Sequence, residues 1–156
     1  MIVKLRAVKP QDDEFLLSVY TASRAYELSL VPWSAEQKAN FVKQQFIAQQ
    51  HHYQTYYKGA QFNVILADEA PVGRYYLFRG REEIRIIDIT LLPEHRHKGI
   101  GKPLIQDLLN EAQENSKRVR IHVEVFNPES VQLFERLGFS KIENDGVNYL
   151  MEWLPV

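Results

Sequence analysis

Cysteine is absent from this sequence. Disulfide bonds, zinc sites built on thiolates and cysteine nucleophiles are therefore excluded. No segment approaches the ~18 uninterrupted apolar residues that a membrane-spanning helix needs, so we expect no membrane partner. The opening residues, MIVKLRAVKPQDDEF, also lack the apolar stretch of a signal peptide. We therefore expect a soluble, cytoplasmic protein.

An excess of charge of one sign is missing as well. The 156 residues include 19 Lys and Arg against 20 Asp and Glu, which gives a formal net charge of −1. Because a nucleic-acid-binding domain usually carries a clear positive excess, this balance argues against a nucleic-acid partner. The length suits one domain with a sizeable hydrophobic core, and we predict a single domain over residues 1–156.

Hydrophobic periodicity predicts a mixed α/β fold with the element order β-α-α-β-β-β-α-β-α-β-β. Ser34 followed by Gln37 has the pattern of a capping box, which predicts that a long helix begins there. Residues 69–71 are interpreted as a turn, and short turns predict that the three central strands form an antiparallel meander. Strands are predicted near residues 2–7, 62–68, 72–80, 81–92, 119–126, 139–144 and 147–154, and the other helices near 12–30, 99–115 and 128–137.

The segment LPEHRHKGIGKPL, residues 92–104, places two glycines and several basic residues between a predicted strand and a predicted helix. The first amides of a helix have no internal partners, and the helix dipole puts partial positive charge there. Glycines let the backbone approach an anion closely, so the segment predicts an anion-binding turn. The alternative is a tight connection with a solvated basic surface, because a single G-x-G is a weak motif. A Walker motif is absent, and Leu104 stands where a dinucleotide-binding fingerprint needs glycine.

Two blocks of the sequence resemble the GNAT superfamily of N-acetyltransferases. R-H-K-G-I-G at residues 96–101 is similar to the R/Q-x-x-G-x-G/A signature for acetyl-CoA, and it follows LLPEHR. NPESVQLFERLGF at residues 127–139 is similar to the second block of the family. The predicted element order also matches the family, so the resemblance covers nearly the whole chain. It implies the family's fold, a mostly antiparallel mixed sheet with one splayed parallel pair of strands.

The resemblance also implies a cofactor site. Backbone amides between strand and helix would bind the diphosphate of acetyl-CoA, and the pantetheine arm would lie along the end of the preceding strand. An amide of that strand would face the thioester carbonyl. The implied cofactor-binding residues are Ile89, Thr90, Leu91, Arg96, His97, Lys98, Gly99, Ile100, Gly101, Lys102, Asn127 and Phe134.

This sequence departs from the family at Phe134. Many members have a tyrosine there whose hydroxyl protonates the departing thiolate, and phenylalanine has no proton to give. Phe134 would then pack against the pantetheine arm. Asn127 has two open interpretations, a contact to the pantetheine or a helix cap.

A general base must take a proton from the attacking ammonium. Asp88 interrupts an apolar run, and Glu124 alternates with Val123 and Val125, so these two carboxylates are the candidates. For Asp88 the alternative is a structural carboxylate bonded to nearby backbone or to Arg74. No metal site is expected, because His51 and His52 lack the spacing of metal ligands.

The resulting hypothesis is an N-acetyltransferase that transfers an acetyl group from acetyl-CoA to a primary amine by direct attack in a ternary complex. The acceptor is a small-molecule amine or a peptide amine, and its identity stays open. A non-catalytic, regulatory acyl-CoA-binding module is the alternative. The last strand, NYLMEWL, has the character of an exposed edge, so a homodimer also stays open.

Overall fold

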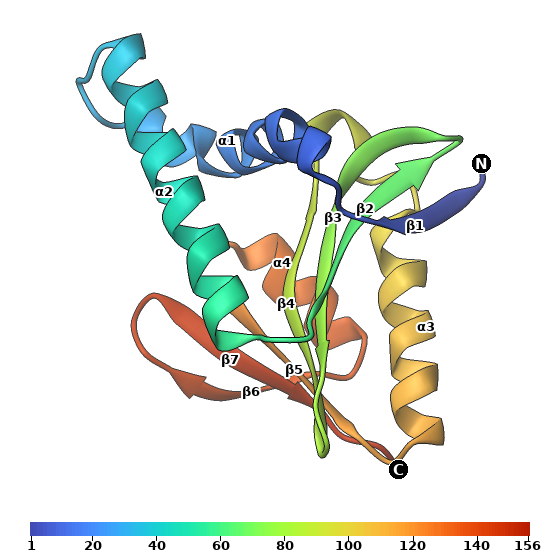
Figure 1. Ribbon diagram of the computed structural model, residues 1–156. Helices are drawn as coiled ribbons and strands as arrows, with labels where there is room; N and C mark the ends of the chain where they lie inside the picture. Colours follow the sequence, from blue (N-terminus) through green and yellow to red (C-terminus); the bar gives the residue numbers. More distant parts are fainter. The chain divides into compact units, whose positions relative to one another are not determined.

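The computed structural model describes all residues, 1–156, and it has the predicted mixed α/β architecture (Figure 1). Its seven-stranded sheet has the order β1-β2-β3-β4-β5-β7-β6, in which β4 and β5 form the parallel pair. No helix combines the length and the apolar character needed to cross a membrane. The strands are β1 Val3–Ala7, β2 Gln61–Ala67, β3 Ala70–Arg79, β4 Glu83–Leu91, β5 Arg118–Glu124, β6 Ser140–Asn144 and β7 Asn148–Trp153, and the helices are α1 Asp13–Ser29, α2 Ala35–Tyr56, α3 Gly101–Glu114 and α4 Pro128–Arg136.

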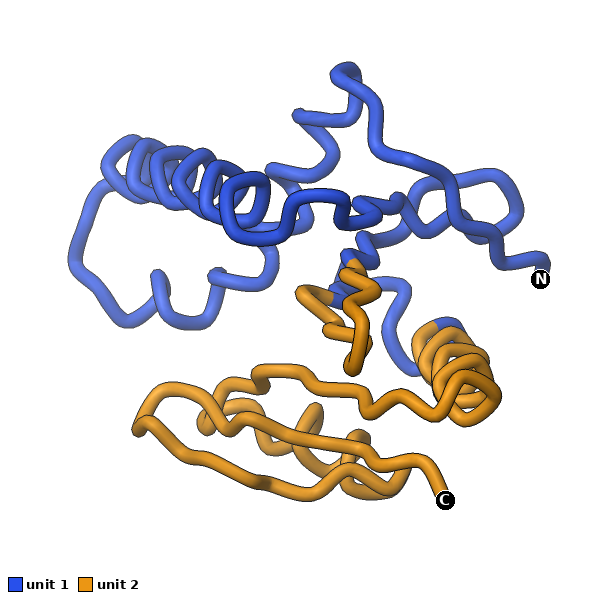
Figure 2. The backbone as a smooth tube through the Cα atoms, turned by 60° about the horizontal axis from the view of Figure 1, so that its bottom comes forward, with its two compact units in different colours: residues 1–76, 89–100 blue, residues 77–88, 101–156 orange.

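The chain folds into two compact units (Figure 2). Unit 1 comprises residues 1–76 and 89–100, and unit 2 comprises residues 77–88 and 101–156. Strands β3 and β4 each contribute residues to both units, because the unit boundaries fall inside these strands.

The helical part of unit 1 is formed by α1 and α2. Ser34 caps α2 as predicted, because its hydroxyl accepts a hydrogen bond from the amide of Gln37 at 3.1 Å while the Gln37 side chain accepts one from the amide of Ser34 at 2.9 Å. Apolar residues at helical spacing then meet in one core, in which the rings of Tyr20 and Phe46 lie 5.9 Å apart. The buried members of this core are Leu16, Tyr20, Val42 and Phe46.

Strands β1 and β2 pair antiparallel in unit 1, with Val3 opposite Ala67. The turn that follows β2 lies at Asp68 and Glu69, one position earlier than predicted, and both residues have positive φ, 49° and 69°. A pair of left-handed residues is the tight hairpin connection whose twist matches that of the strands. Pro71 therefore lies inside β3 rather than in the turn.

Unit 2 is organised around β5. Strand β7 pairs with it antiparallel along its length, from Val119 opposite Trp153 to Glu124 opposite Asn148. The parallel pairing with β4 is short: it covers Glu83–Ile86 opposite Arg118–Ile121, although both strands continue beyond these residues within the unit. A partial parallel pairing agrees with the splayed pair expected from the sequence.

The two faces of β5 differ in chemistry. Val119, Ile121 and Val123 are buried, and β5 contacts both α3 and α4. These helices bury apolar residues of their own, so the apolar face of β5 belongs to the core of unit 2. Since side chains alternate along a strand, the opposite face carries Arg118, Arg120, His122 and Glu124.

An ion pair fixes the connection between β1 and α1 in unit 1. The guanidinium of Arg6 donates two hydrogen bonds of 2.8 Å to the carboxylate of Asp12, and the amide of Lys9 donates a third at 2.7 Å. The Asp12 side chain is 8% exposed and that of Arg6 31%. The Arg6 guanidinium lowers the pKa of Asp12 from 3.8 to about 2, against the opposing effect of burial.

Asp12→Asn should destabilise the protein at neutral pH. Because the pKa of Asp12 is lower in the folded state, its carboxylate stabilises the fold above pH ~4, and this contribution disappears as the pH falls toward ~2. We expect the free energy of unfolding at pH 7 to fall by about 1 to 2 kcal/mol, with Arg6 partly screened by solvent. Urea denaturation at several pH values measures this. The adjacent exposed position provides the control, Asp13→Asn, and an equal loss in both variants would contradict the role of the pair.

Candidate functional site

The turn between β4 and α3 has a strongly curved backbone in unit 1. A short 3₁₀ turn at Pro93–His95 follows β4, and then His97 and Gly99 adopt positive φ, 60° and 75°. Residues 96–99 are exposed, whereas the Ile100 side chain is 2% exposed and anchors the end of the turn. Left-handed residues in such a turn present successive backbone N–H groups on a concave surface that suits an anion.

Gly99 is required by its backbone conformation rather than by lack of room. A Cβ built on Gly99 meets nothing within 4 Å, but a φ of 75° is strained for most side chains. The space in front of the turn is therefore open. The helix α3 then begins at Gly101, so the free amides and the positive end of its dipole coincide with the turn.

The basic residues of the turn have different roles. Arg96 donates a hydrogen bond from Nε to the carbonyl oxygen of Leu91 at 3.1 Å, so it ties the turn to the end of β4. Lys98 and Lys102 are exposed. Contacts of these two lysines to an anion stay a prediction.

The end of β4 packs closely against β3 at Gly73. A Cβ at Gly73 would lie 2.3 Å from the carbonyl oxygen of Thr90 and 2.9 Å from Cδ2 of Leu91. The amide of Leu92 donates to the carbonyl oxygen of Val72 at 2.9 Å in the same region. Gly73 was not among the residues singled out by sequence, although a glycine inside a strand often marks such a close backbone approach.

The two candidate bases lie on different faces of unit 2. The alternation of β4, in which Ile84 and Ile86 are buried, places Asp88 on the same face as this apolar pair. Glu124 lies on the opposite face, with Arg120 and His122 of β5. Both carboxylate residues are half-buried. A single acceptor approaching one face would therefore meet only one of them.

Asn127 caps α4. Its side-chain oxygen accepts a hydrogen bond from the amide of Ser130 at 3.2 Å, and Pro128 occupies the first turn of the helix, where no amide hydrogen is needed. The capping interpretation is therefore confirmed. The side-chain NH₂ of Asn127, on an exposed residue, stays a predicted cofactor contact.

Phe134 is a core residue of unit 2. Its side chain is 3% exposed, and its ring packs edge-to-face against Phe139 at 5.1 Å with an interplanar angle of 77°. Gly138 ends α4 with a φ of 99°, which brings Phe139 back toward the helix. The aromatic residue at this position is held by its neighbours, and a contact to the pantetheine arm stays a prediction.

The α1–α2 junction of unit 1 exposes aromatic side chains. Trp33 and Phe41 are each 41% exposed and pack edge-to-face at 5.2 Å, and Tyr26 is 77% exposed. Phe46 and Tyr75, by contrast, are buried in the core. The exposed rings at the junction are the ones available for a ligand.

No group of His, Cys, Asp and Glu side chains in the protein lies close enough together to hold a metal ion. His52 stacks on Tyr56 of the same helix, with ring centroids 4.5 Å apart. His52 therefore has aromatic neighbours on its own helix, Tyr53 and Tyr56.

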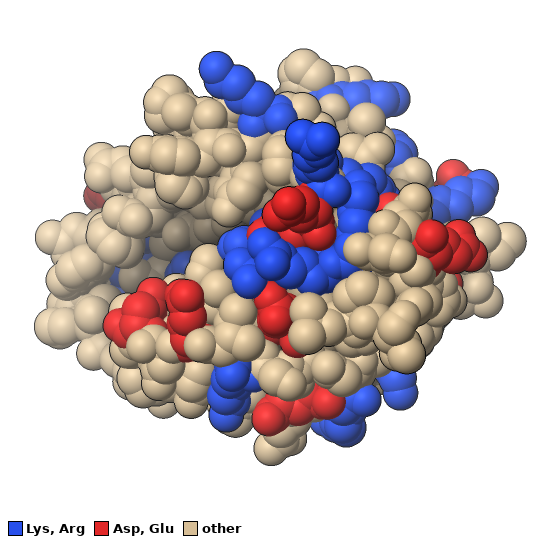
Figure 3. Space-filling view, turned by 90° about the horizontal axis from the view of Figure 1, so that it is seen from below, with Lys and Arg blue, Asp and Glu red and all other residues tan.

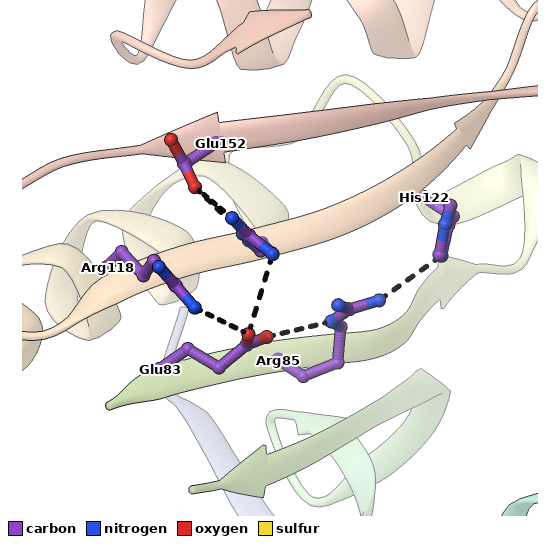
Figure 4. A network of polar contacts seen from close by, with 6 residues as sticks. Glu83, Arg85, Arg118, His122 and Glu152 are labelled. Carbon is purple, nitrogen blue, oxygen red and sulfur yellow. Dashed lines mark hydrogen bonds and ion pairs between the residues drawn. The ribbon is translucent and has the colours of Figure 1, made fainter. Parts of the chain in front are cut away.

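The charged face of unit 2 was not anticipated from sequence. Figure 3 shows basic side chains gathered around acidic ones on the face that it presents. A network of polar contacts joins β4, β5 and β7 (Figure 4). Arg120 donates from Nε to Glu152 at 2.8 Å, and Arg85 donates from Nε to Glu83 at 3.2 Å. The complete network comprises Glu83, Arg85, Arg118, Arg120, His122 and Glu152.

His122 titrates below its ordinary range. Partial desolvation lowers its pKa although the residue as a whole is exposed, and the nearby Arg85 guanidinium lowers this pKa further. Asp145 and Glu143 oppose this effect. The imidazole is consequently neutral at pH 7.

Comparison with known proteins identifies relatives of this arrangement. The model of the acetyltransferase (GNAT) family matches residues 22–139. No curated protein sequence matches the chain. Among solved structures, PaiA N-acetyltransferase from Thermoplasma acidophilum, crystallised with coenzyme A, has a TM-score of 0.73 at 19% identity, covering 99% of each chain.

Two further structures share the fold. Ard1 from Thermoplasma volcanium has a TM-score of 0.63 at 22% identity, with 100% of this chain and 99% of that chain covered. A spermidine N-acetyltransferase chimera of SpeG from Vibrio cholerae and hSSAT has a TM-score of 0.64 at 20% identity, with 97% of this chain and 94% of that one covered. At these identities the likeness shows the fold.

Gly73→Ala should disturb the end of β4. The added methyl group would overlap the Thr90 carbonyl, and relieving such a clash costs about 1–3 kcal/mol. We expect a lower free energy of unfolding in urea and faster amide hydrogen exchange at residues 89–92. Gly80→Ala is the matched control, since its Cβ would lie 3.1 Å from the nearest atom, the Glu83 carbonyl oxygen. Undisturbed exchange at residues 89–92 in Gly73→Ala would show that β4 tolerates the substitution.

Proposed function

Because this chain belongs to the acetyltransferase (GNAT) family, we propose that it transfers an acetyl group from acetyl-CoA to a primary amine by direct attack in a ternary complex. Family membership supports acetyl transfer from coenzyme A in general. The observation that carries the proposal here is the open turn with positive φ at His97 and Gly99, which leads directly into α3.

The turn suits the diphosphate of acetyl-CoA. The amides of residues 97–102 would donate to the phosphate oxygens, and Pro103, which has no amide hydrogen, comes directly after them. The α3 dipole favours the negative charge, and Lys98 and Lys102 add ammonium groups. The empty space where a Gly99 Cβ would be supports this fit.

The end of β4 suits the pantetheine arm and the reacting carbonyl. Ile89, Thr90 and Leu91 are half-buried, and the paired register of β4 with β5 ends before them, at Ile86. The amide of Ile89 or Thr90 would donate to the carbonyl oxygen of the thioester. A donor held there in advance stabilises the negative charge that develops on this oxygen during attack.

Glu124 is the base that the structure supports better. It lies on the face of β5 opposite the buried valines, together with other charged side chains, whereas Asp88 follows the apolar alternation of β4. The carboxylate would take the proton of the ammonium directly or through water. Phe134 has no proton to give, so the thiolate leaves without a side-chain acid, which a thiol with a pKa of ~8.5 permits.

We propose that residues 1–156 act as one catalytic domain in the cytoplasm, on a small-molecule or peptide amine. One structural neighbour is a spermidine N-acetyltransferase chimera, and another was crystallised with coenzyme A. The last strand, β7, does not form the exposed edge expected from the sequence, because it lies between β5 and β6 in the sheet. The edge strand is β6, whose residues are all exposed, and this edge leaves a homodimer open. Neither a metal nor a nucleic acid has a role in this proposal.

The buried Phe134 favours the alternative of a non-catalytic acyl-CoA-binding module, because the family's hydroxyl acid is missing there. Release of free thiol from acetyl-CoA in the presence of an amine library separates the two functions. A module that only binds would retain cofactor affinity and release no thiol above the rate of spontaneous hydrolysis.

Gly99→Asp and Gly99→Asn test the anion-binding turn as a matched pair. Aspartate and asparagine tolerate the positive φ of position 99 better than other side chains do. Because the two side chains have nearly the same shape, the two variants differ mainly in charge. We expect acetyl-CoA to bind at least about 10-fold more weakly to Gly99→Asp than to Gly99→Asn, which corresponds to ~1.4 kcal/mol of repulsion. Isothermal titration calorimetry measures both affinities, and equal affinities would place the diphosphate elsewhere.

Glu124→Gln and Asp88→Asn, measured in parallel, identify the base. We expect Glu124→Gln to lower kcat by about 10²-fold or more while the affinity for acetyl-CoA stays unchanged, since general-base catalysis contributes about 10²–10⁴-fold. Asp88→Asn should have a smaller effect on kcat. Steady-state kinetics with a saturating amine measures both, and the reverse order of effects would assign the base to Asp88.

A further inference from the structure

The charged face of unit 2 lies on β4, β5 and β7, on the side of β5 away from its buried valines (Figure 4). The network contains the guanidinium groups of Arg85, Arg118 and Arg120 and the carboxylates of Glu83 and Glu152, so three positive charges meet two negative ones. These five groups alone have an excess of one positive charge, which the carboxylate of Glu124 on the same face of β5 balances. The carboxylates of Asp145 and Glu143 also act on His122.

Hydrogen-bond donors are also in excess on this face. Arg118 approaches Glu83 only to 3.6 Å, which is an ion pair without a hydrogen bond, and its buried Nε has no partner. Arg120 is shared between Glu152 at 2.7 Å and Glu83 at 3.8 Å. Glu83 and Glu152 each already face a guanidinium. An added acceptor would therefore find hydrogen-bond donors in this network, whereas an added cation would find both of the network's carboxylates paired.

Arg85 determines the tautomer of His122. Its Nη1 lies 3.3 Å from Nδ1 of His122, and a guanidinium can only donate, so Nδ1 is the acceptor. The neutral ring then carries its proton on Nε2. His122 is exposed, and it consequently presents an N–H donor next to the Arg85 guanidinium.

His122 and Glu124 occupy successive positions on one face of β5. Side chains two residues apart on a strand are separated by about 7 Å. A donor for an anion and the proposed base therefore lie about 7 Å apart, a span that a compact zwitterion bridges when each of its charged groups makes a hydrogen bond to one of them.

We propose that the amine acceptor also carries an anionic group, a carboxylate or a phosphonate, which binds to Arg85 and His122 while its ammonium group lies at Glu124. This inference rests on the proposed function and adds the acceptor class. The amine nitrogen forms a bond to the acetyl carbon, the C–S bond breaks, the ammonium proton goes to Glu124, and the thiolate departs. A polyamine, positively charged along its length, is disfavoured by the guanidinium groups.

Matched acceptor pairs test the inference. L-phenylalanine is compared with phenethylamine, L-alanine with ethylamine, and aminomethylphosphonate with methylamine, and spermidine is added as a polyamine. Either the carboxylates or the phosphonate should be the preferred acceptors. For the preferred class, we expect kcat/KM to exceed that of the matching amine without the anionic group by at least ~10-fold, an effect that a single charge-assisted hydrogen bond can supply. The carboxylate and phosphonate pairs distinguish the two anions. Equal kcat/KM values within every pair, or a higher kcat/KM for spermidine than for the anionic acceptors, would overturn the inference. Such a result would leave the proposed acetyl transfer intact.

Variants of the charged face locate the contact. In Arg85→Gln, the ratio of kcat/KM between an anionic acceptor and its partner amine should fall toward one, mainly because KM for the anionic acceptor rises. Arg85→Lys should restore part of this ratio. His122→Ala is the second variant, because His122 is exposed and its removal spares the packing of the sheet. Arg136→Gln removes the same charge from an exposed position on α4 and should leave the preference intact. An undiminished preference in both Arg85→Gln and His122→Ala would overturn the assignment.

A binding measurement separates failure of this inference from failure of the proposed function. N-acetyl-L-phenylalanine and N-acetylphenethylamine, which need no turnover, are titrated into the full-length protein by calorimetry. We expect the carboxylated compound to bind at least ~10-fold more tightly in the wild type and the difference to vanish in Arg85→Gln. Equal affinities would overturn the inference even if amines are acetylated. Absence of acetylated product with every amine, while acetyl-CoA binds, would overturn the proposed function and with it the acceptor role of this face.

Discussion

Backbone amides at the start of α3 are the interaction on which this account depends. A helix leaves its first N–H groups without partners, and the positive φ values of His97 and Gly99 curve the preceding chain at that end. Side chains hold the curve in place: Ile100 is buried, and Arg96 bonds to the last carbonyl of β4. The turn can therefore offer donors to an anion without reorganising, and the end of β4, held against Gly73, has a fixed position relative to it.

Strand β5 divides the chemistry of unit 2 between its two faces. On one face, buried valine and isoleucine side chains form a core with α3 and α4, and Phe134 contributes to packing rather than proton transfer. On the other face, three arginines interact with Glu83 and Glu152, and Glu124 lies on the same face of β5. This division explains how one strand can stabilise the unit and also present charged groups to a ligand.

Much of the fold was predictable from the sequence, because its signals are local. Hydrophobic periodicity predicted the element order and the fold class, the Ser34 capping box predicted the start of α2, and the two glycines within residues 92–104 predicted a turn between β4 and α3. The turn at Asp68 and Glu69 was misplaced by one residue, since neither residue is glycine although both have positive φ. The charged face could not be predicted, because it brings together positions 83, 118 and 152, and their proximity depends on strand register. The same reasoning applies to the two carboxylates, whose separation onto different faces follows from the pairing of β4 with β5.

Nuclear magnetic resonance of the backbone amides tests the central claim most directly. The ¹⁵N-labelled protein is titrated with coenzyme A and, separately, with pantetheine, which has no diphosphate. We predict that coenzyme A shifts the amide signals of residues 97–102 strongly and saturably, and that pantetheine leaves these signals in place while shifting those of residues 89–91. If coenzyme A saturates the protein without moving the amides of residues 97–102, the account of the turn is contradicted.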